Sequence, residues 1–169
     1  MKINPCRSTA KYVAISGIML GIAAALTAIE SMLSVFMPAG VRIGLANIVV
    51  LTAAACINLP TAFIIALLKS VFVLLTRGIT AGAMSFGGGM LAFAVTAVML
   101  SMTRASYVMI SVSGAIAHII GQLIVAALLT QSKYTFYYAP LLIATGTASG
   151  FVTGAAANAV IPHFSNIKK

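Results

Sequence analysis

The sequence predicts an all-α membrane protein whose six transmembrane helices form a single domain. Of its 169 residues, 62% are hydrophobic and only 7% are charged, whereas a soluble domain usually carries about 25% charged residues. Long apolar runs such as 49–57 and 119–129 lack the alternation that a transmembrane strand requires. A spanning helix needs roughly 20 apolar residues, so the chain length accommodates six spans with short connections.

Breaks between the apolar runs place the spans. Asn58-Leu59-Pro60 predicts a tight turn into the third span, because proline suits a first helical position. The glycine-rich stretch 77–89 predicts a loop and an irregular start of the fourth span, and its part 85–89 fits either a gate or a packing hinge. Pro162 is expected to end the sixth span. The expected spans cover residues 12–33, 44–57, 61–75, 84–102, 107–129 and 137–161.

Basic residues lie mainly at the ends of the apolar runs, which is typical of orientation signals and not of a nucleic-acid-binding face. The net charge is +9. With both termini in the cytoplasm, six basic residues fall on the inner side and three on the outer side, and this asymmetry favours that orientation in a cell membrane. These are Lys2, Arg7, Lys11, Arg104, Lys168 and Lys169 inside, and Arg42, Arg77 and Lys133 outside.

Lys69 is the basic residue that lies inside a predicted span, where a lysine must reach the interface, pair with another group or line a wet cavity. Arg77 follows eight residues later, about two helical turns on, so both can lie on one helix face. With Arg42 they predict a positive, outward-opening mouth suited to a carboxylate or phosphate ligand. The alternative is that Arg42 and Arg77 only contact lipid headgroups.

Four other polar residues at membrane depth are candidate site residues. Glu30 is the only acidic residue of the chain; it is either functional or merely reaches the interface or pairs with a base such as Arg42. His118 and Gln122 are four residues apart and therefore lie on one face of the fifth span. Like Asn47, they could bridge helices or contact a ligand.

Small residues recur every fourth position in two spans. Gly17, Gly21 and Ala25 form such a stripe in the first span, and Gly146, Gly150 and Gly154 form another in the sixth. Small faces of this kind let membrane helices approach closely. The stripes predict close packing, either against another span of this chain or against a separate membrane subunit.

The sequence offers little for catalysis, metals or cofactors. It contains no aspartate and no phosphate-binding loop ending in Gly-Lys-Ser/Thr, so neither aspartate-held magnesium nor ATP hydrolysis of that type is expected. Two histidines and the widely separated Cys6 and Cys56 do not form a haem, flavin or iron–sulfur site. A redox scaffold is therefore the least favoured hypothesis.

Three segments carry a resemblance to a known family. The run 41–49 (VRIGLANIV), the glycine-rich 85–90 (SFGGGM) and the run 113–123 (SGAIAHIIGQL) resemble the bacterial Gx transporter family, which is also described as heptaprenyl diphosphate synthase component I. These segments are spread over most of the chain.

The resemblance implies two functions. In size and span number the family is similar to the S components of energy-coupling factor transporters, which bind a vitamin or cofactor precursor and use a shared transmembrane subunit and two ATPases for uptake. Gly17, Gly21 and Ala25 would then dock that subunit, and Arg42, Asn47, Lys69, Arg77, His118 and Gln122 would bind the substrate. The alternative is a membrane component of heptaprenyl diphosphate synthesis that works with a catalytic prenyltransferase.

Overall fold

The structure, a computed structural model, describes residues 9–33, 44–102 and 105–166 and is helical almost throughout this part. Six α-helices and one short 3₁₀ helix follow one another, and no strand occurs among the described residues. They are α1 (Thr9–Leu33), α2 (Asn47–Cys56), α3 (Leu59–Arg77), α4 (Ile79–Met102), α5 (Tyr107–Thr130), η1 (Lys133–Tyr138) and α6 (Ala139–Asn166). The predicted all-α fold with six helices is confirmed.

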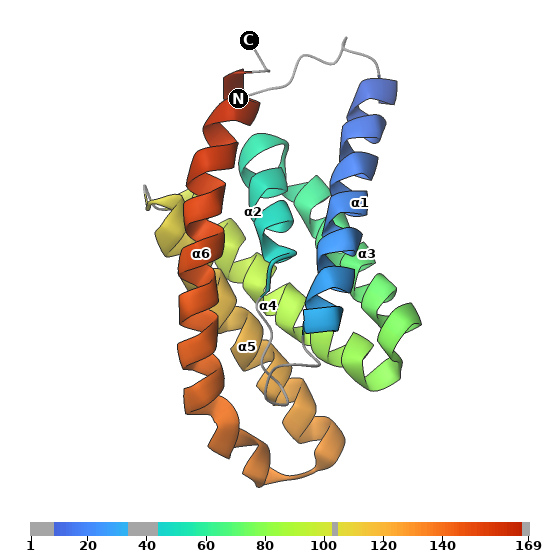
Figure 1. Ribbon diagram of the computed structural model, residues 1–169, viewed down its shortest axis with the longest axis vertical. Coiled ribbons are helices and arrows are strands. Elements are labelled where there is room, and N and C mark those ends of the chain that lie inside the picture. The colour runs from blue at the N-terminus through green and yellow to red at the C-terminus, as the bar shows by residue number, and fades with distance from the viewer. Residues whose placement is uncertain (1–8, 34–43, 103–104, 167–169) are drawn as a thin grey trace.

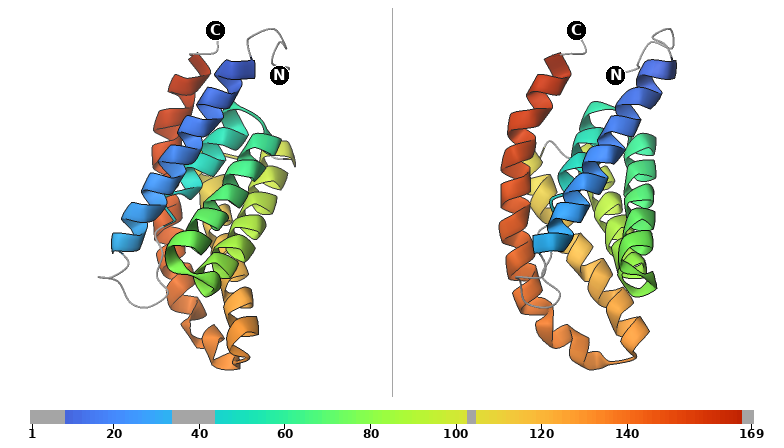
Figure 2. Two further views of the ribbon diagram at one scale, coloured as in Figure 1. Left: turned by 90° about the vertical axis from the view of Figure 1, so that its right-hand side faces the viewer. Right: turned by 45° about the vertical axis from the view of Figure 1, so that its right-hand side comes forward.

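The helices run alternately up and down, so that the first residues of α1 and the last residues of α6 lie at the same end of the molecule (Figure 1). Helices α3, α4, α5 and α6 pack in chain order, each against the next. The short α2 lies among them and contacts α3, α4, α5 and α6. Among the described elements α1 contacts only α2 and α3, and it lies on the outside of the bundle (Figure 2).

Helix α2 is shorter than the second span expected at 44–57. Five helices of the described chain are long and apolar enough to cross a membrane, and α2 is not one of them. Its 10 residues rise only about 15 Å, half of the roughly 30 Å hydrocarbon layer. It is instead a central, largely buried element.

The glycine-rich segment is not a loop, as the sequence had suggested. Helix α4 already begins at Ile79, and residues 85–89 lie in its middle. The connection from α3 is the single residue Gly78, whose φ of +87° favours glycine. Glycines are tolerated within membrane helices because neighbouring helices pack against them.

The glycines of α4 form surfaces that pack against two neighbouring helices, α3 and α5. A Cβ placed on Gly88 would lie 2.7 Å from the His118 carbonyl oxygen of α5, and one on Gly121 would lie 2.6 Å from the Gly87 carbonyl oxygen. Gly89 faces α3, where Ser70 Oγ lies 3.5 Å from its added Cβ. Of the two roles considered for 85–89, close packing is the one that this geometry supports.

The ends of other helices agree with the sequence in part. Asn58 caps α3 by accepting a hydrogen bond from the Thr61 amide at 2.8 Å, and Pro60 lies in the first turn. Pro162, in contrast, does not end α6, which continues to Asn166. A proline costs an internal helix one amide donor, and here the helix extends by one further turn despite that loss.

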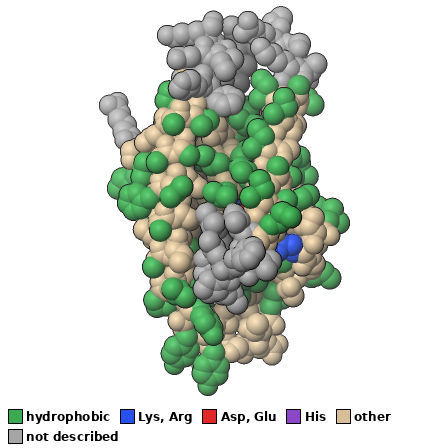
Figure 3. Space-filling view, viewed as in Figure 1, with side chains coloured by type: hydrophobic (Ala, Val, Ile, Leu, Met, Phe, Trp, Pro, Cys, Tyr) green, Lys and Arg blue, Asp and Glu red, His purple; other side chains and the backbone are tan. Residues whose placement is uncertain are grey.

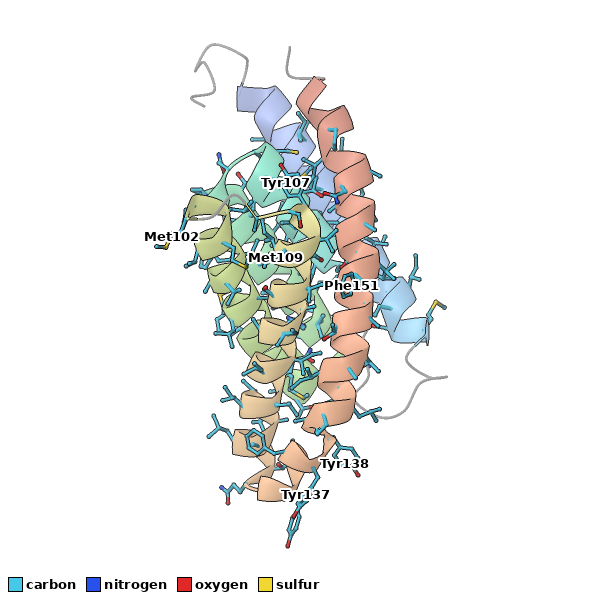
Figure 4. All side chains as sticks on the ribbon, turned by 90° about the vertical axis from the view of Figure 1, so that its left-hand side faces the viewer. Met102, Tyr107, Met109, Tyr137, Tyr138 and Phe151 are labelled. Carbon is cyan, nitrogen blue, oxygen red and sulfur yellow. The ribbon has the colours of Figure 1, made fainter. Side chains whose placement is uncertain are left out.

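On the face drawn in Figure 3, hydrophobic side chains are spread over most of the described part of the molecule. Large hydrophobic side chains such as Leu75, Ile79 and Met102 are more than three-quarters exposed, which fits contact with lipid. At the α5–α6 end, the exposed aromatic residues of η1 include Tyr137 and Tyr138, which project outward (Figure 4). Exposed tyrosines of this kind are typical of a membrane–water interface.

Candidate functional site

Lys69 lies near the middle of α3 and is buried, with only 5% of its surface exposed. Its Nζ donates a hydrogen bond to Asn47 Oδ1 at 2.7 Å. Asn47 is the first residue of α2, so this bond ties the short central helix to α3. A buried ammonium group at membrane depth is costly and marks a functional site by default.

Glu30 of α1 fixes the start of α2 from the other side. Its Oε1 accepts a hydrogen bond from the Gly44 amide at 2.8 Å, and its side chain is 9% exposed. Gly44 has a φ of +70°, and its carbonyl accepts from the Asn47 amide at 2.9 Å. A chain of hydrogen bonds thus joins α1, α2 and α3 through Glu30, Gly44, Asn47 and Lys69.

A small cavity of about 20 Å³ lies where α1, α3, α4 and α5 meet. Glu30 and two basic residues, Lys69 and Arg77, contribute to its wall together with His118. The predicted common face of Lys69 and Arg77 is therefore seen in their joint contribution to this cavity. The remaining wall is formed by Thr27, Gly44, Ala46, Val73 and Ser85.

A second cavity of about 30 Å³ lies in the centre of the bundle and shares Gly44 and Lys69 with the first. Its polar lining comes from every helix except α1: Asn47, Lys69, Thr96, Ser111, Ser149 and Thr153. Volumes of this size hold one or two water molecules. Lys69 therefore lies between two small cavities whose walls are partly polar.

His118 and Gln122 lie on one buried face of α5, as their spacing predicted, at 7% and 5% exposure. Their Nε2 atoms are 3.1 Å apart. Since an amide nitrogen only donates, His118 accepts at Nε2 in this arrangement, which places the proton of the neutral ring on Nδ1. His118 reaches the small cavity, while Gln122 lies behind it, against Gly88 of α4.

The predicted site residues therefore divide into three groups. Asn47 and Lys69 are in direct contact, and Arg77 and His118 reach the same small cavity as Lys69. Gln122 lines neither cavity and acts on the site through His118. Arg77 is otherwise exposed and donates to Ser31 Oγ at 3.4 Å. Arg42 lies outside the described residues.

The hydroxyl groups of the central cavity were not predicted from the sequence. Ser111 of α5 and Thr153 of α6 are hydrogen-bonded at 2.8 Å, and Ser149 lies one helical turn before Thr153. Serine and threonine are common in membrane helices, where they usually bond to their own backbone. Only the relative rotation of α5 and α6 shows that these hydroxyls meet at one cavity.

The two stripes of small residues have different surroundings. Gly146, Gly150 and Gly154 pack against α5; a Cβ on Gly150 would lie 2.8 Å from Val112 Cα. Gly17, Gly21 and Ala25 are exposed, and a Cβ on either glycine would meet no described atom within 4 Å. The α6 stripe is thus used within the chain, whereas no described helix packs on the α1 stripe.

The side chains of the site offer positive charge and hydrogen bonds. In the described part of the chain, no three His, Cys, Asp or Glu residues come together as metal ligands would. Glu30, the one acidic residue of the whole sequence, is engaged with the Gly44 amide. The side chains around Lys69 can attract an anion and donate hydrogen bonds to it.

Comparison with known proteins identifies the family. The model of the family described as heptaprenyl diphosphate synthase component I matches residues 19–160, which include every described residue of both cavities. Neither the comparison with curated proteins nor that with solved structures gives a match. Since the match extends over most of the sequence, the chain belongs to the heptaprenyl diphosphate synthase component I family.

Proposed function

We propose that this protein is the ligand-binding membrane subunit of a transporter and that it captures a small anionic molecule beside Lys69. The observation that carries the proposal is the burial of this lysine between two small cavities with partly polar walls. A membrane protein retains such a costly group where it contributes to function. A vitamin, a cofactor precursor or an isoprenoid-related acid would each provide the anion.

Electrostatics favours an anion at this position. A positive charge interacts several times more strongly in a low-dielectric interior than in water. Arg77 adds a second positive charge at the same cavity and His118 adds a hydrogen-bonding group, while the Glu30 carboxylate on this wall accepts from the Gly44 amide. Asn47 orients the ammonium group, and Gln122 orients the imidazole. Arg42 precedes Gly44 and Asn47 by a few residues in the sequence, and we propose that it adds a further positive charge to the anion site.

The cavities must enlarge when the ligand binds. Sites for small-molecule ligands usually enclose several hundred Å³, far more than the 30 and 20 Å³ present here. Helix α1 is the natural element to move, because it contacts only α2 and α3 among the described elements. Its displacement would separate Glu30 from Gly44 and open the small cavity.

The exposed stripe on α1 is proposed as the docking face for an energising partner. Gly17, Gly21 and Ala25 offer a surface on which another membrane helix can pack closely. The chain lacks a Walker phosphate-binding loop, so ATP-driven uptake requires separate ATPases and a shared transmembrane subunit. Docking at α1 would also couple the partner directly to the helix that covers the small cavity.

We place the protein in the bacterial plasma membrane with both termini in the cytoplasm. The supporting observations are the excess of basic residues on that side of the sequence and the arrangement of the helices. The start of α1 and the end of α6 lie at one end of the bundle, opposite the exposed tyrosines of η1 (Figures 1 and 4).

A second candidate follows from the family description, which names a component of heptaprenyl diphosphate synthase. In this hypothesis the chain is a non-catalytic membrane partner of a prenyltransferase, and Lys69 and Arg77 hold the diphosphate of a prenyl substrate or product. The catalytic subunit would then supply the acidic residues that bind magnesium, since this chain has a single carboxylate side chain.

Isolation of the protein from native membranes in mild detergent distinguishes the two candidates. The transport proposal predicts that a transmembrane subunit and ATPases co-purify. It also predicts that Gly21→Leu, which fills the α1 stripe, reduces their recovery at least tenfold. The control Ile22→Leu, on the adjacent exposed position, should leave recovery unchanged. Co-purification of an aspartate-rich prenyltransferase without ATPases would support the biosynthetic alternative and contradict the transport proposal.

A further inference from the structure

The polar groups that line the central cavity are of two chemical kinds. Lys69 of α3 and Asn47 of α2 contribute an ammonium and an amide group, and Thr96 of α4 with Ser111, Ser149 and Thr153 of α5 and α6 contributes hydroxyl groups. In the described chain no Cα atom of α3 comes within 8 Å of one in α5 or α6. Lys69 and the hydroxyls of α5 and α6 are therefore brought together at the cavity and not by direct packing of their helices, whereas Asn47 lies on α2, which also contacts α5 and α6.

The hydroxyl groups of α5 and α6 can accept hydrogen bonds. Ser149 donates its hydroxyl hydrogen to the Gly146 carbonyl at 3.0 Å, and Thr153 donates to the Ser149 carbonyl at 2.9 Å. Ser111 Oγ lies 2.8 Å from Thr153 Oγ1, and Ser111 is the donor of this pair when Thr153 donates to the Ser149 carbonyl. The hydroxyl oxygens of Ser149 and Thr153 then keep lone pairs for a donor in the cavity.

We propose that the ligand is a small polar acid that bears N–H or O–H donors at the end away from its anionic group. This inference rests on the proposed function, because it takes the anion to lie beside Lys69. The donors would bond to the hydroxyl oxygens of α5 and α6. A prenyl chain at the same place would bury those oxygens without a hydrogen-bond donor, which is unfavourable.

Binding of three defined probes to the detergent-solubilised full chain, measured by calorimetry, tests the inference. Orotate is a carboxylate whose ring carries N–H donors, benzoate is a ring carboxylate without them, and isopentenyl diphosphate is an anion with an apolar tail. We expect orotate to bind at least tenfold more tightly than the other two. Benzoate or isopentenyl diphosphate binding as tightly as orotate would overturn the inference.

Substitutions on α6 test whether the preference for orotate depends on the Thr153 hydroxyl. Thr153→Val should weaken orotate binding about three- to tenfold, the contribution of one hydrogen bond, and leave benzoate binding unchanged. Thr153→Ser keeps the hydroxyl and should keep the affinity. Thr147→Val is the matched control, because Thr147 also bonds to its own helix, at 2.7 Å from the Ile143 carbonyl, but does not line the cavity. Equal effects of Thr153→Val and Thr147→Val would also contradict the inference.

Lys69→Met separates this inference from the proposed function. Suppose that Lys69→Met binds none of the three probes, but that the unmodified protein binds benzoate more tightly than orotate. The anion site at Lys69 is then supported, and the inference that the ligand carries hydrogen-bond donors is contradicted. If no probe binds the unmodified protein, or if every probe binds Lys69→Met as tightly as the unmodified protein, both the anion site and the inference are contradicted.

Discussion

At the scale of single residues, the hydrogen bond from Lys69 Nζ to Asn47 Oδ1 gives a buried cation a polar partner inside an apolar bundle. The bond is 2.7 Å long and largely removed from solvent. A hydrogen bond to a charged group contributes more than one between neutral groups. Loss of the acceptor should therefore be costly as long as the ammonium group remains.

Asn47→Leu is expected to lower the free energy of unfolding by about 1.5–3 kcal/mol, as measured by denaturant titration in detergent micelles. In a Lys69→Met background the same change should cost much less, because the charge that needed the acceptor is gone. Additive effects of the two substitutions would show that the Lys69–Asn47 contact has no energetic role.

The sequence predicted that Lys69 and Asn47 were important but not that they touch. An intramembrane lysine is conspicuous by itself, since hydrophobic neighbours cannot solvate it. Its partner depends on how α2 and α3 are rotated about their axes, and no local pattern encodes that rotation. The hydroxyls of Ser111 and Thr153 were missed for the same reason, because each is unremarkable within its own helix.

At the scale of elements, glycines allow α4 and α5 to approach so closely that no methyl group fits between them. An added Cβ at Gly88 would lie 2.7 Å from both Gln122 Cγ and the His118 carbonyl oxygen. In contrast, one at Gly17 on the outer face of α1 would meet no described atom within 4 Å. These two positions allow the same substitution to be compared in filled and open surroundings.

Gly88→Ala should destabilise the protein by about 1–3 kcal/mol through overpacking, seen as a lower midpoint of thermal unfolding in detergent. Gly17→Ala should leave the midpoint unchanged or raise it slightly, since alanine favours helix by up to about 1 kcal/mol over glycine. An unchanged midpoint for Gly88→Ala would mean that α4 and α5 are not packed as described here.

Helix positions could be predicted from the sequence where the apolar runs are long, as for α5, whose bounds differ from expectation only at Thr130. The errors concern residues whose effect depends on their surroundings. In a water-soluble protein, Gly87 and Gly88 would suggest a loop. Between membrane helices, such glycines are the positions at which two helices come into close contact. Pro162 suggests a helix end, but α6 continues past it. The length of α2 was overestimated, because a helix buried in the centre of the bundle needs the same apolar composition as a helix in contact with lipid.

At the scale of the whole molecule, five long helices enclose the short α2 and with it a polar interior. Hydrophobic side chains are spread over the face drawn in Figure 3, and buried polar residues that include Lys69 and Glu30 line two small cavities that share Lys69. This is the inverse of a soluble protein, and it fits a membrane protein that withdraws a polar ligand from water. Helix α1 has limited contacts inside the bundle and an exposed small-residue stripe, and it would connect the proposed site to the proposed partner surface.

Native mass spectrometry of the gently extracted protein and of its Lys69→Met variant tests whether Lys69 binds the anion. We expect a small anionic molecule on the unmodified protein, and an occupancy at least tenfold lower on a variant that remains folded. A protein that carries no small molecule, or one retained equally by Lys69→Met, would contradict the assignment of Lys69 as the anion-binding residue.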